Sequence, residues 1–172
     1  MKKVLLCGYM GCGKSTVAQI LSHKTDLPQF DLDDLIEKNE GMSIPEIFEK
    51  NGEVYFRKLE HRLFTQLMGS PDDFILALGG GTPAYANNHL LMNGEGVTSF
   101  FLRASIETLH DRLIDENENR PLVAGKASDE LKEHIAKHLF DRNYYYNQAT
   151  YTVVVDGKSA EQVADEILEK LA

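Results

Sequence analysis

Short apolar runs alternate with helical patterns along this chain, and that alternation restricts the possible folds more than any other feature. Four apolar runs have the length of buried strands: residues 4–7, 74–78, 97–102 and 151–155. Apolar residues at helical spacing follow the first, third and last of these runs. Continuous apolar strands separated by helices are typical of a parallel sheet that helices cover on both faces. The sequence therefore predicts an α/β fold.

Two regions interrupt this alternation. Residues 32–68 have an almost wholly helical pattern, which is more than one crossover connection needs, so we predict a small helical subdomain beside the sheet. Residues 115–127 are polar and lack apolar periodicity. Because a loop of that length in a compact domain is usually functional or disordered, this segment is a second feature to explain.

The length and charge of the chain limit its organisation and its partners. A chain of 172 residues suits one domain, residues 1–172, with room for a small subdomain. Its 27 acidic and 18 basic residues give a net charge of −9, and such a field repels nucleic acid and anionic membranes. An anionic ligand would therefore need a local cluster of cationic side chains.

The N-terminus and the cysteines favour a soluble, reduced, cytoplasmic protein. The apolar run after Lys2 and Lys3 ends at Gly8, so it is shorter than the roughly 7–15 residues of a secretion-signal core. No window approaches the ~18 apolar residues that span a bilayer. Cys7 and Cys12 are too few and too close for a disulfide framework or a four-ligand zinc site. We interpret them as a buried strand thiol and a small loop residue.

A glycine-rich segment joins the first apolar run to the first helical pattern. Residues 8–16, Gly-Tyr-Met-Gly-Cys-Gly-Lys-Ser-Thr, contain the pattern G-x-x-x-x-G-K-[ST]. The glycines allow backbone N–H groups to point at phosphate, and the following helix N-terminus adds a positive dipole. Lys14 would reach the β- and γ-phosphates of a nucleotide, and Ser15 would supply a hydroxyl to Mg²⁺.

The acidic residue that usually helps to hold the metal is missing from its obvious place. The run 74–78 ends in three glycines, so the carboxylate must come from elsewhere. Asp31 and Asp33 lie where a second strand would end, and alternation along an extended segment would put both on the same side. One could then serve the metal and the other the substrate. The alternative is that one of them caps the helix that follows.

An ordered set of motifs resembles the shikimate kinase family from about residue 3 to residue 156. Besides the glycine-rich loop, the matching segments are Phe30-Asp31-Leu32-Asp33, Phe56-Arg57-Lys58-Leu59-Glu60, Leu78-Gly79-Gly80-Gly81, Arg120-Pro121-Leu122, and Arg142 with Tyr145. The resemblance implies a P-loop kinase fold with a five-stranded parallel sheet, a helical shikimate-binding subdomain over residues 32–68 and a mobile lid over residues 115–127. It also implies transfer of the ATP γ-phosphoryl group to the 3-hydroxyl of shikimate, a step of aromatic amino acid biosynthesis, with one Mg²⁺ per subunit.

The resemblance also assigns roles to individual residues. Those implied to bind ATP are Gly11, Cys12, Gly13, Lys14, Ser15, Thr16, Arg112 near the adenine, and Arg120 from the lid. Those implied to bind shikimate are Asp33, Arg57, Gly79, Gly80, Gly81 and Arg142, with Glu60 orienting Arg57. Ser15 and Asp31 would hold the metal. Lys14, Asp33 as the candidate base, and Arg120 would be catalytic.

The arginines support these roles on chemical grounds. The chain has only six arginines, and three of them, Arg57, Arg120 and Arg142, fall at matching positions. A polyhydroxylated acid needs planar bidentate donors for its carboxylate and acceptors for its hydroxyls, which Arg and Asp supply. These residues would concentrate positive charge in one cleft of an acidic protein.

Three other features have simpler interpretations. Where family members offer a basic residue to the adenine after the last strand, this chain has Asp156-Gly157-Lys158-Ser159, and Lys158 is only a candidate substitute. His134 and His138 are spaced i, i+4, but without a third ligand they indicate a surface helix. Residues 144–146, three tyrosines, are interpreted as a helix end that packs on the sheet rather than as a base-stacking platform.

Two competing functions follow from the same loop. The first is another small-metabolite kinase, for example one acting on gluconate. Such a function would not explain why Arg57, Arg142 and the triple glycine occur together. A nucleotide-dependent switch would not need Asp33, and the sequence has no Asn-Lys-x-Asp for guanine. We expect a monomer whose partners are ATP and shikimate.

Overall fold

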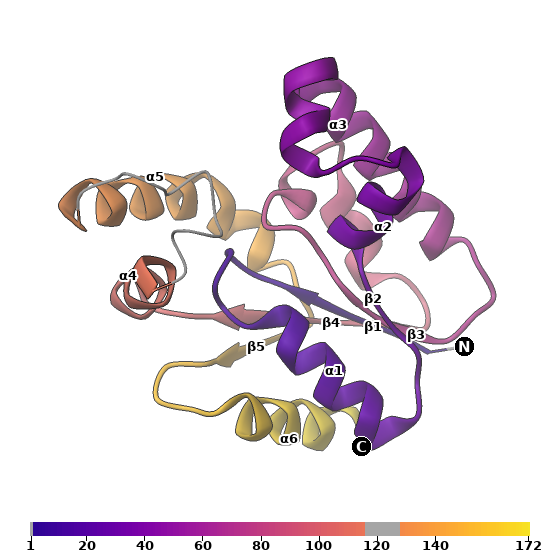
Figure 1. Cartoon of the computed structure of the whole chain (residues 1–172). Helices are drawn as coiled ribbons and strands as arrows, with labels where there is room; N and C mark the ends of the chain where they lie inside the picture. The colour runs from indigo at the N-terminus through magenta and orange to yellow at the C-terminus, as the bar shows by residue number, and fades with distance from the viewer. Residues whose placement is uncertain (1, 116–127) are drawn as a thin grey trace.

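The computed structural model describes residues 2–115 and 128–172 and contains one five-stranded sheet (Figure 1). Every strand pairing in the sheet is parallel, and the order is β2-β3-β1-β4-β5. The strands are β1 Lys3–Cys7, β2 Gln29–Asp31, β3 Phe74–Ala77, β4 Val97–Arg103 and β5 Tyr151–Val154. The predicted α/β class and the five-stranded parallel sheet are confirmed.

Helices cover both faces of the sheet, as predicted. On one face, α1 (Lys14–Thr25) and α6 (Ala160–Leu171) pack together, and on the other lie α2 (Leu32–Glu40) and α3 (Ile44–Met68) (Figure 1). The remaining helices are α4 (Ile106–Asp115), α5 (Ser128–Tyr146) and the short 3₁₀ segments η1 (Thr82–Ala84) and η2 (Asn88–Asn93). Of the helices in the described residues, none has the length and apolar character to cross a membrane.

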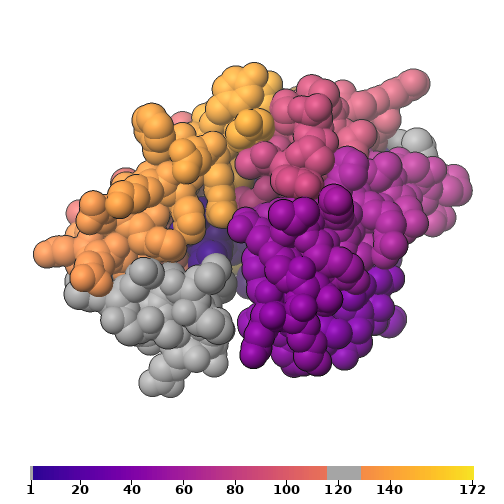
Figure 2. All heavy atoms as spheres, turned by 90° about the horizontal axis from the view of Figure 1, so that it is seen from above, coloured from indigo at the N-terminus to yellow at the C-terminus, as the bar shows by residue number. Residues whose placement is uncertain are grey.

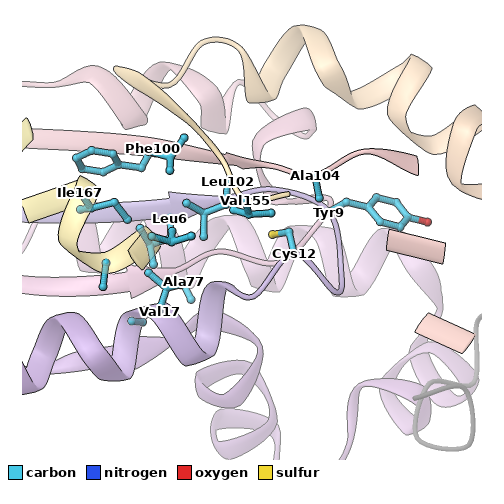
Figure 3. Packing of buried hydrophobic residues seen from close by; sticks show 14 of the residues in the cluster. Leu6, Tyr9, Cys12, Val17, Ala77, Phe100, Leu102, Ala104, Val155 and Ile167 are labelled. Carbon is cyan, nitrogen blue, oxygen red and sulfur yellow. The ribbon is translucent and has the colours of Figure 1, made fainter. Parts of the chain in front are cut away.

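The two faces of the sheet belong to two hydrophobic clusters. Alternate residues of β1 divide between them: Leu6 belongs to the cluster on the α1 and α6 side, while Leu5 and Cys7 belong to the cluster under α2 and α3. Figure 3 shows the first cluster, with Tyr9 and Cys12 near Ala104 at one end of it. The core therefore extends without a break into the loop that follows β1.

The helical segment 32–68 consists of two helices that pack against each other. Gly41 ends α2 in the left-handed region at φ 69°, and the Ser43 side chain caps the start of α3. Within α3, Gly52 has φ 85° and ψ 170°, which interrupts the helical backbone after its second turn. The prediction of a largely helical region is confirmed.

The position of β1 places the candidate site. The chain leaves β1 between β3 and β4, which lie on opposite sides of it. In an open parallel sheet, ligands bind outside the carboxyl ends of the strands, where the strand order reverses. The loops after β1 and β3, residues 8–13 and 78–81, meet at that point.

Candidate functional site

The loop after β1 has the backbone of a phosphate-binding loop. Gly8, Gly11 and Gly13 have φ values of 147°, 87° and 100°, a region that residues with a Cβ atom rarely adopt. A Cβ atom on Gly8 would also lie 2.7 Å from the Leu102 carbonyl oxygen. No described side chain caps the start of α1 and its first turn contains no acidic residue, so its N–H groups and dipole are available to an anion.

Cationic side chains lie against this loop from two elements. Lys14 Nζ donates to the carbonyl oxygens of Gly8 at 2.6 Å and Tyr9 at 3.2 Å. Arg112, on α4, donates from Nη1 to the Gly11 carbonyl oxygen at 3.1 Å. Cys12, which was interpreted only as a small loop residue, is 2% exposed and packs in the core. The structure thus brings Lys14 and Arg112 together at the loop.

Ser15 and Asp31 form the candidate metal site. Ser15 Oγ donates to Oδ2 of Asp31 across 2.6 Å, and both side chains are at least partly accessible. Oδ1 of Asp31 accepts from the backbone N–H groups of Asp33 at 2.9 Å and Asp34 at 3.4 Å, so Asp31 also caps α2. The capping interpretation and the metal interpretation therefore apply to different oxygens of one carboxylate. Oxygen ligands of this kind fit Mg²⁺, which is usually bound by one or two protein groups together with phosphate oxygens.

The predicted reason for placing Asp31 and Asp33 on one side was wrong. The strand ends at Asp31 and the helix begins at Leu32, so Asp33 is in the first turn of α2 rather than in an extended segment. There its side chain approaches the turn after β3: a Cβ atom on Gly79 would lie 2.9 Å from Asp33 Oδ1. Burial raises the pKa of Asp33 to about 6, and the negative charges of Asp31 and Glu60 add to the shift.

The three glycines after β3 each admit a different functional side chain. Asp33 lies against Gly79, and Nη1 of Arg142 would be 3.3 Å from a Cβ atom on Gly80. A Cβ atom on Gly81 would collide with the guanidinium of Arg57, 2.7 Å from its Nη1. The turn therefore lies beside the Asp33 carboxylate of α2 and the guanidinium groups of Arg57 on α3 and Arg142 on α5. The Glu60 carboxylate is there as well, with Oε2 3.3 Å from a Cβ atom on Gly79. Gly80 also lies close to the loop after β1, since a Cβ atom added to it would be 3.7 Å from the backbone nitrogen of Met10.

Different contacts surround the two arginines: a hydrogen bond for Arg57 and an aromatic ring for Arg142. Arg57 Nη1 donates to Oε1 of Glu60 at 2.9 Å, and Glu60 is only 1% exposed, so the predicted orienting role of Glu60 has the required geometry. On α5, Tyr146 donates to the Gly80 carbonyl oxygen at 2.5 Å, one turn of helix after Arg142. The Arg142 guanidinium lies over the Tyr9 ring, 5.8 Å from its centroid.

Figure 2 shows a hollow between α5, in orange, and the α2–α3 region, in purple, with indigo atoms from the N-terminal part of the chain at its floor. The glycine-rich loop belongs to that indigo part, and the Gly79–Gly81 turn approaches it at Met10. A cleft at this place would allow one ligand on the loop and another against the turn. The net charge of −9 makes this local concentration of Arg57, Arg142 and Lys14 distinctive.

The loop after β1 also contacts α5, which its sequence did not predict. Tyr9 is 1% exposed, and its hydroxyl lies 2.7 Å from His138 Nδ1, while the His134 and His138 rings are 4.2 Å apart. Helix α5 has exposed residues such as Glu133 and Lys137, in agreement with the surface-helix interpretation. The two histidines, however, are partly buried: His138 contacts Tyr9 of the loop, and His134 packs on His138. No short motif joins residues 129 positions apart, so this contact left no signal in one sequence.

Three further assignments have different outcomes. Lys158 forms an ion pair with Glu166 at 2.7 Å, while Asp156 accepts from the Ser105 N–H and ties the segment after β5 to the start of α4. Of the three tyrosines that end α5, only Tyr146 is buried; it packs on Phe101, in β4. The predicted lid over residues 115–127, with Arg120, lies outside the described residues except for Asp115.

Comparisons with known proteins agree with this geometry. A family model described as shikimate kinase matches residues 10–172. A shikimate kinase from Flavobacterium johnsoniae is 53% identical over 172 residues, which is 100% of both chains. The crystal structure of shikimate kinase from Bacteroides thetaiotaomicron is 30% identical, with a TM-score of 0.91 over 99% of this chain and 98% of that one.

A third protein connects the fold with a ligand. Shikimate kinase from Acinetobacter baumannii in complex with shikimate is 30% identical, with a TM-score of 0.88 over 99% of this chain and 93% of that chain. The family match covers the glycine-rich loop from Met10 onward and every other motif that suggested the resemblance. With the fold, the site geometry and these matches in agreement, the chain belongs to the shikimate kinase family.

Proposed function

We propose that this protein transfers the γ-phosphoryl group of ATP to the 3-hydroxyl of shikimate, giving shikimate 3-phosphate and ADP. The observation that carries the proposal is the Gly79–Gly81 turn, which gathers Asp33, Arg57 and Arg142 beside a phosphate-binding loop. The relatives named above are shikimate kinases, and one of the similar structures contains shikimate. The chemistry of the gathered groups matches that substrate.

Arg57 and Arg142 are the proposed carboxylate receptors. A planar guanidinium can donate two parallel N–H groups to a carboxylate, which fixes its orientation as well as its charge. Arg57 presents that group from a helix, and its Nη1 is already held by a carboxylate that is 1% exposed. Arg142 lies beside Gly80 and Arg57 beside Gly81, so the two guanidinium groups approach neighbouring residues of one turn.

Lys14, the loop N–H groups and Arg112 are the proposed receptors of ATP. In the described structure Lys14 donates to carbonyl oxygens of its own loop, and a bound γ-phosphate would offer it a stronger anionic acceptor. The resemblance places Thr16, Gly11, Cys12 and Gly13 in the same phosphate site. Charge that develops on the transferring group would be stabilised by these preorganised donors.

Ser15 and Asp31 are the proposed Mg²⁺ ligands. Their oxygens are 2.6 Å apart and come from the start of α1 and the end of β2, so a cation there would sit beside the loop that holds the phosphates. When bound, Mg²⁺ supplies positive charge that neutralises the phosphate oxygens during transfer. Asp31 keeps its other oxygen on the N–H groups of α2, which holds its carboxylate in one orientation.

Asp33 is the proposed general base. A carboxylate with a pKa of about 6 is mostly ionised at neutral pH, yet it accepts a proton more readily than an ordinary aspartate. As the shikimate oxygen attacks the γ-phosphorus and the bond to the β-phosphate oxygen breaks, the hydroxyl proton passes to Asp33. The electron pair leaves with ADP.

The direct test is a coupled ADP-release assay with ATP and Mg²⁺. We expect turnover with shikimate and none above background with gluconate. A melting scan separates binding from catalysis, because a ligand at 100 times its Kd adds roughly 2.7 kcal/mol to the stability of the folded state. Stabilisation by gluconate or GTP in preference to ATP and shikimate would contradict the proposal.

A further inference from the structure

A chain of buried polar side chains joins the end of the glycine turn to helix α3. Thr82 and Asn88 are fully buried, and the Glu60 carboxylate is 1% exposed. Thr82 begins η1, directly after Gly81, and Asn88 begins η2. A buried polar group costs free energy unless it has a partner, so the partners of these three side chains strongly constrain the local geometry.

The hydrogen bonds in this chain have defined directions. Thr82 Oγ1 donates to Oε2 of Glu60 at 2.9 Å, on the carboxylate whose other oxygen accepts from Arg57. Asn88 Nδ2 donates to the Thr82 carbonyl oxygen at 3.0 Å, which leaves Asn88 Oδ1 facing His61 Nδ1 at 2.5 Å. Because an amide oxygen can only accept, His61 carries a hydrogen on Nδ1.

The chain of bonds begins and ends on the same helix. Glu60 and His61 are consecutive residues of α3. The Thr82 hydroxyl bonds Glu60 directly, and the Thr82 carbonyl oxygen is linked to His61 by way of Asn88. This double attachment holds η1 against α3 in one register. Gly81 and the Arg57 guanidinium lie in contact between these two attached elements.

We propose that Thr82 is a positioning residue that sets the orientation of Arg57 toward the substrate carboxylate, and that Asn88 and His61 hold Thr82 in place. The inference rests on the proposed function, in which Arg57 binds that carboxylate. The Thr82 hydroxyl is the donor that Glu60 Oε2 receives from the turn. Without it, one oxygen of a buried carboxylate loses its donor, and the carboxylate can rotate away from Arg57 to find another.

The test is steady-state kinetics of Thr82→Val, which keeps the shape of the side chain and removes the hydroxyl. We expect the KM for shikimate to rise roughly tenfold, the usual scale for one hydrogen bond to a charged group. The carboxylate is remote from the transferred phosphoryl group, so kcat and the KM for ATP should change by less than about twofold. Thr82→Ser, which retains the hydroxyl, should restore the wild-type KM for shikimate.

A matched control separates positioning from a general loss of packing. Ser99→Ala removes another fully buried hydroxyl, which bonds Thr150 and Asn93 in the β4 region. This variant should lower the melting temperature and leave the KM for shikimate unchanged. Equal changes in both KM values for Thr82→Val, a change confined to kcat, or no rescue by Thr82→Ser would overturn the inference.

A second variant covers the case in which Thr82→Val does not fold. His61→Phe removes the donor at the outer end of the chain while keeping a planar ring, and His61 is only partly buried. We expect a rise of about threefold in the KM for shikimate, because this residue acts on Arg57 through three others, Asn88, Thr82 and Glu60. An unchanged KM would overturn the inference. A wild-type protein that does not phosphorylate shikimate would instead reject the proposed function.

Discussion

The phosphate loop and the substrate pocket both depend on three glycines, for different physical reasons. In the loop, Gly8, Gly11 and Gly13 have positive φ values, so glycine is required by the backbone itself. In the turn, Gly81 has an ordinary φ of −98°, and glycine is required because the Arg57 guanidinium occupies the space of a Cβ atom. The loop is thus specified by nine consecutive residues, whereas the pocket depends on side chains delivered from three helices. The two regions should therefore respond differently to substitution.

Asp33→Asn should have the largest effect, and it tests the pocket without changing its shape. The amide cannot accept the hydroxyl proton, so we expect kcat to fall by about a hundredfold to ten-thousandfold, as when a general base is removed. ATP affinity, measured by titration, should stay within about threefold of wild type. A variant that keeps normal turnover would show that Asp33 is not the base.

Lys14→Ala should have the next largest effect, on the side of the loop. It removes a charge aimed at the transferring phosphoryl group, and such electrostatic stabilisation is worth about a hundredfold to a thousandfold in kcat. The fold should persist, as judged by a cooperative melting transition. Lys58→Ala, at an exposed lysine of α3, is the matched control and should leave kcat unchanged. Near-normal turnover of Lys14→Ala would reject the phosphate-loop assignment.

Arg57→Lys preserves the charge of the pocket and tests the geometry of the guanidinium alone. Lysine offers one compact ammonium in place of two parallel N–H donors, and the loss of one charge-assisted hydrogen bond is worth roughly tenfold to a hundredfold. Most of the loss should appear as a higher KM for shikimate, with the KM for ATP little changed. Arg62→Lys, at an exposed arginine of the same helix, should change neither value. A higher KM for ATP alone would move Arg57 to the nucleotide site.

The smallest expected effect is on stability. The pKa of Asp33 is raised by burial to about 6, so between its unfolded pKa near 4 and pH 6 the folded state binds more protons than the unfolded state. Stability therefore decreases as the pH rises through this window, and the loss persists at neutral pH. In the absence of Mg²⁺ and ATP, Asp33→Asn should exceed wild type in unfolding free energy at pH 7.5 by on the order of 2 kcal/mol. Denaturant titrations at pH 7.5 and pH 4 should show that the difference in unfolding free energy between Asp33→Asn and wild type shrinks at the lower pH. A difference that does not change with pH would contradict the raised pKa of Asp33.

The nucleotide half of the site was predictable because its determinants are local. The apolar run, the glycine-rich loop and the helical pattern follow one another in residues 4–21, and the structure has β1, the loop and α1 in that order. Family resemblance supplied the pocket residues Asp33, Arg57 and Arg142, and the structure brings all three to the glycine turn. The geometric argument for Asp31 and Asp33 failed, since a helix begins between them and replaces the assumed extended backbone.

Contacts between distant segments were not predictable from one chain. Tyr9 meets His138 and Arg142, and Thr82 meets Glu60, across separations of 22 to 133 positions that no short motif spans. An isolated threonine after three glycines, or a histidine on a helix, has the same local sequence whether it is solvated or buried. Only the packing of α3 and α5 against the sheet determines which of these side chains loses water and must find a partner.

The α/β class, the phosphate loop and the identities of the charged groups follow from local sequence, because strand burial, backbone torsions and side-chain chemistry are properties of residues and their neighbours. The tertiary structure alone decided how those charged groups face one another. Asp33 in the first turn of α2, Arg57 within α3 and Arg142 near the end of α5 converge on Gly79, Gly80 and Gly81. The absence of side chains on these glycines leaves room for them. Chain topology creates that proximity, and the buried bonds of Glu60 and Tyr146 hold it in one arrangement.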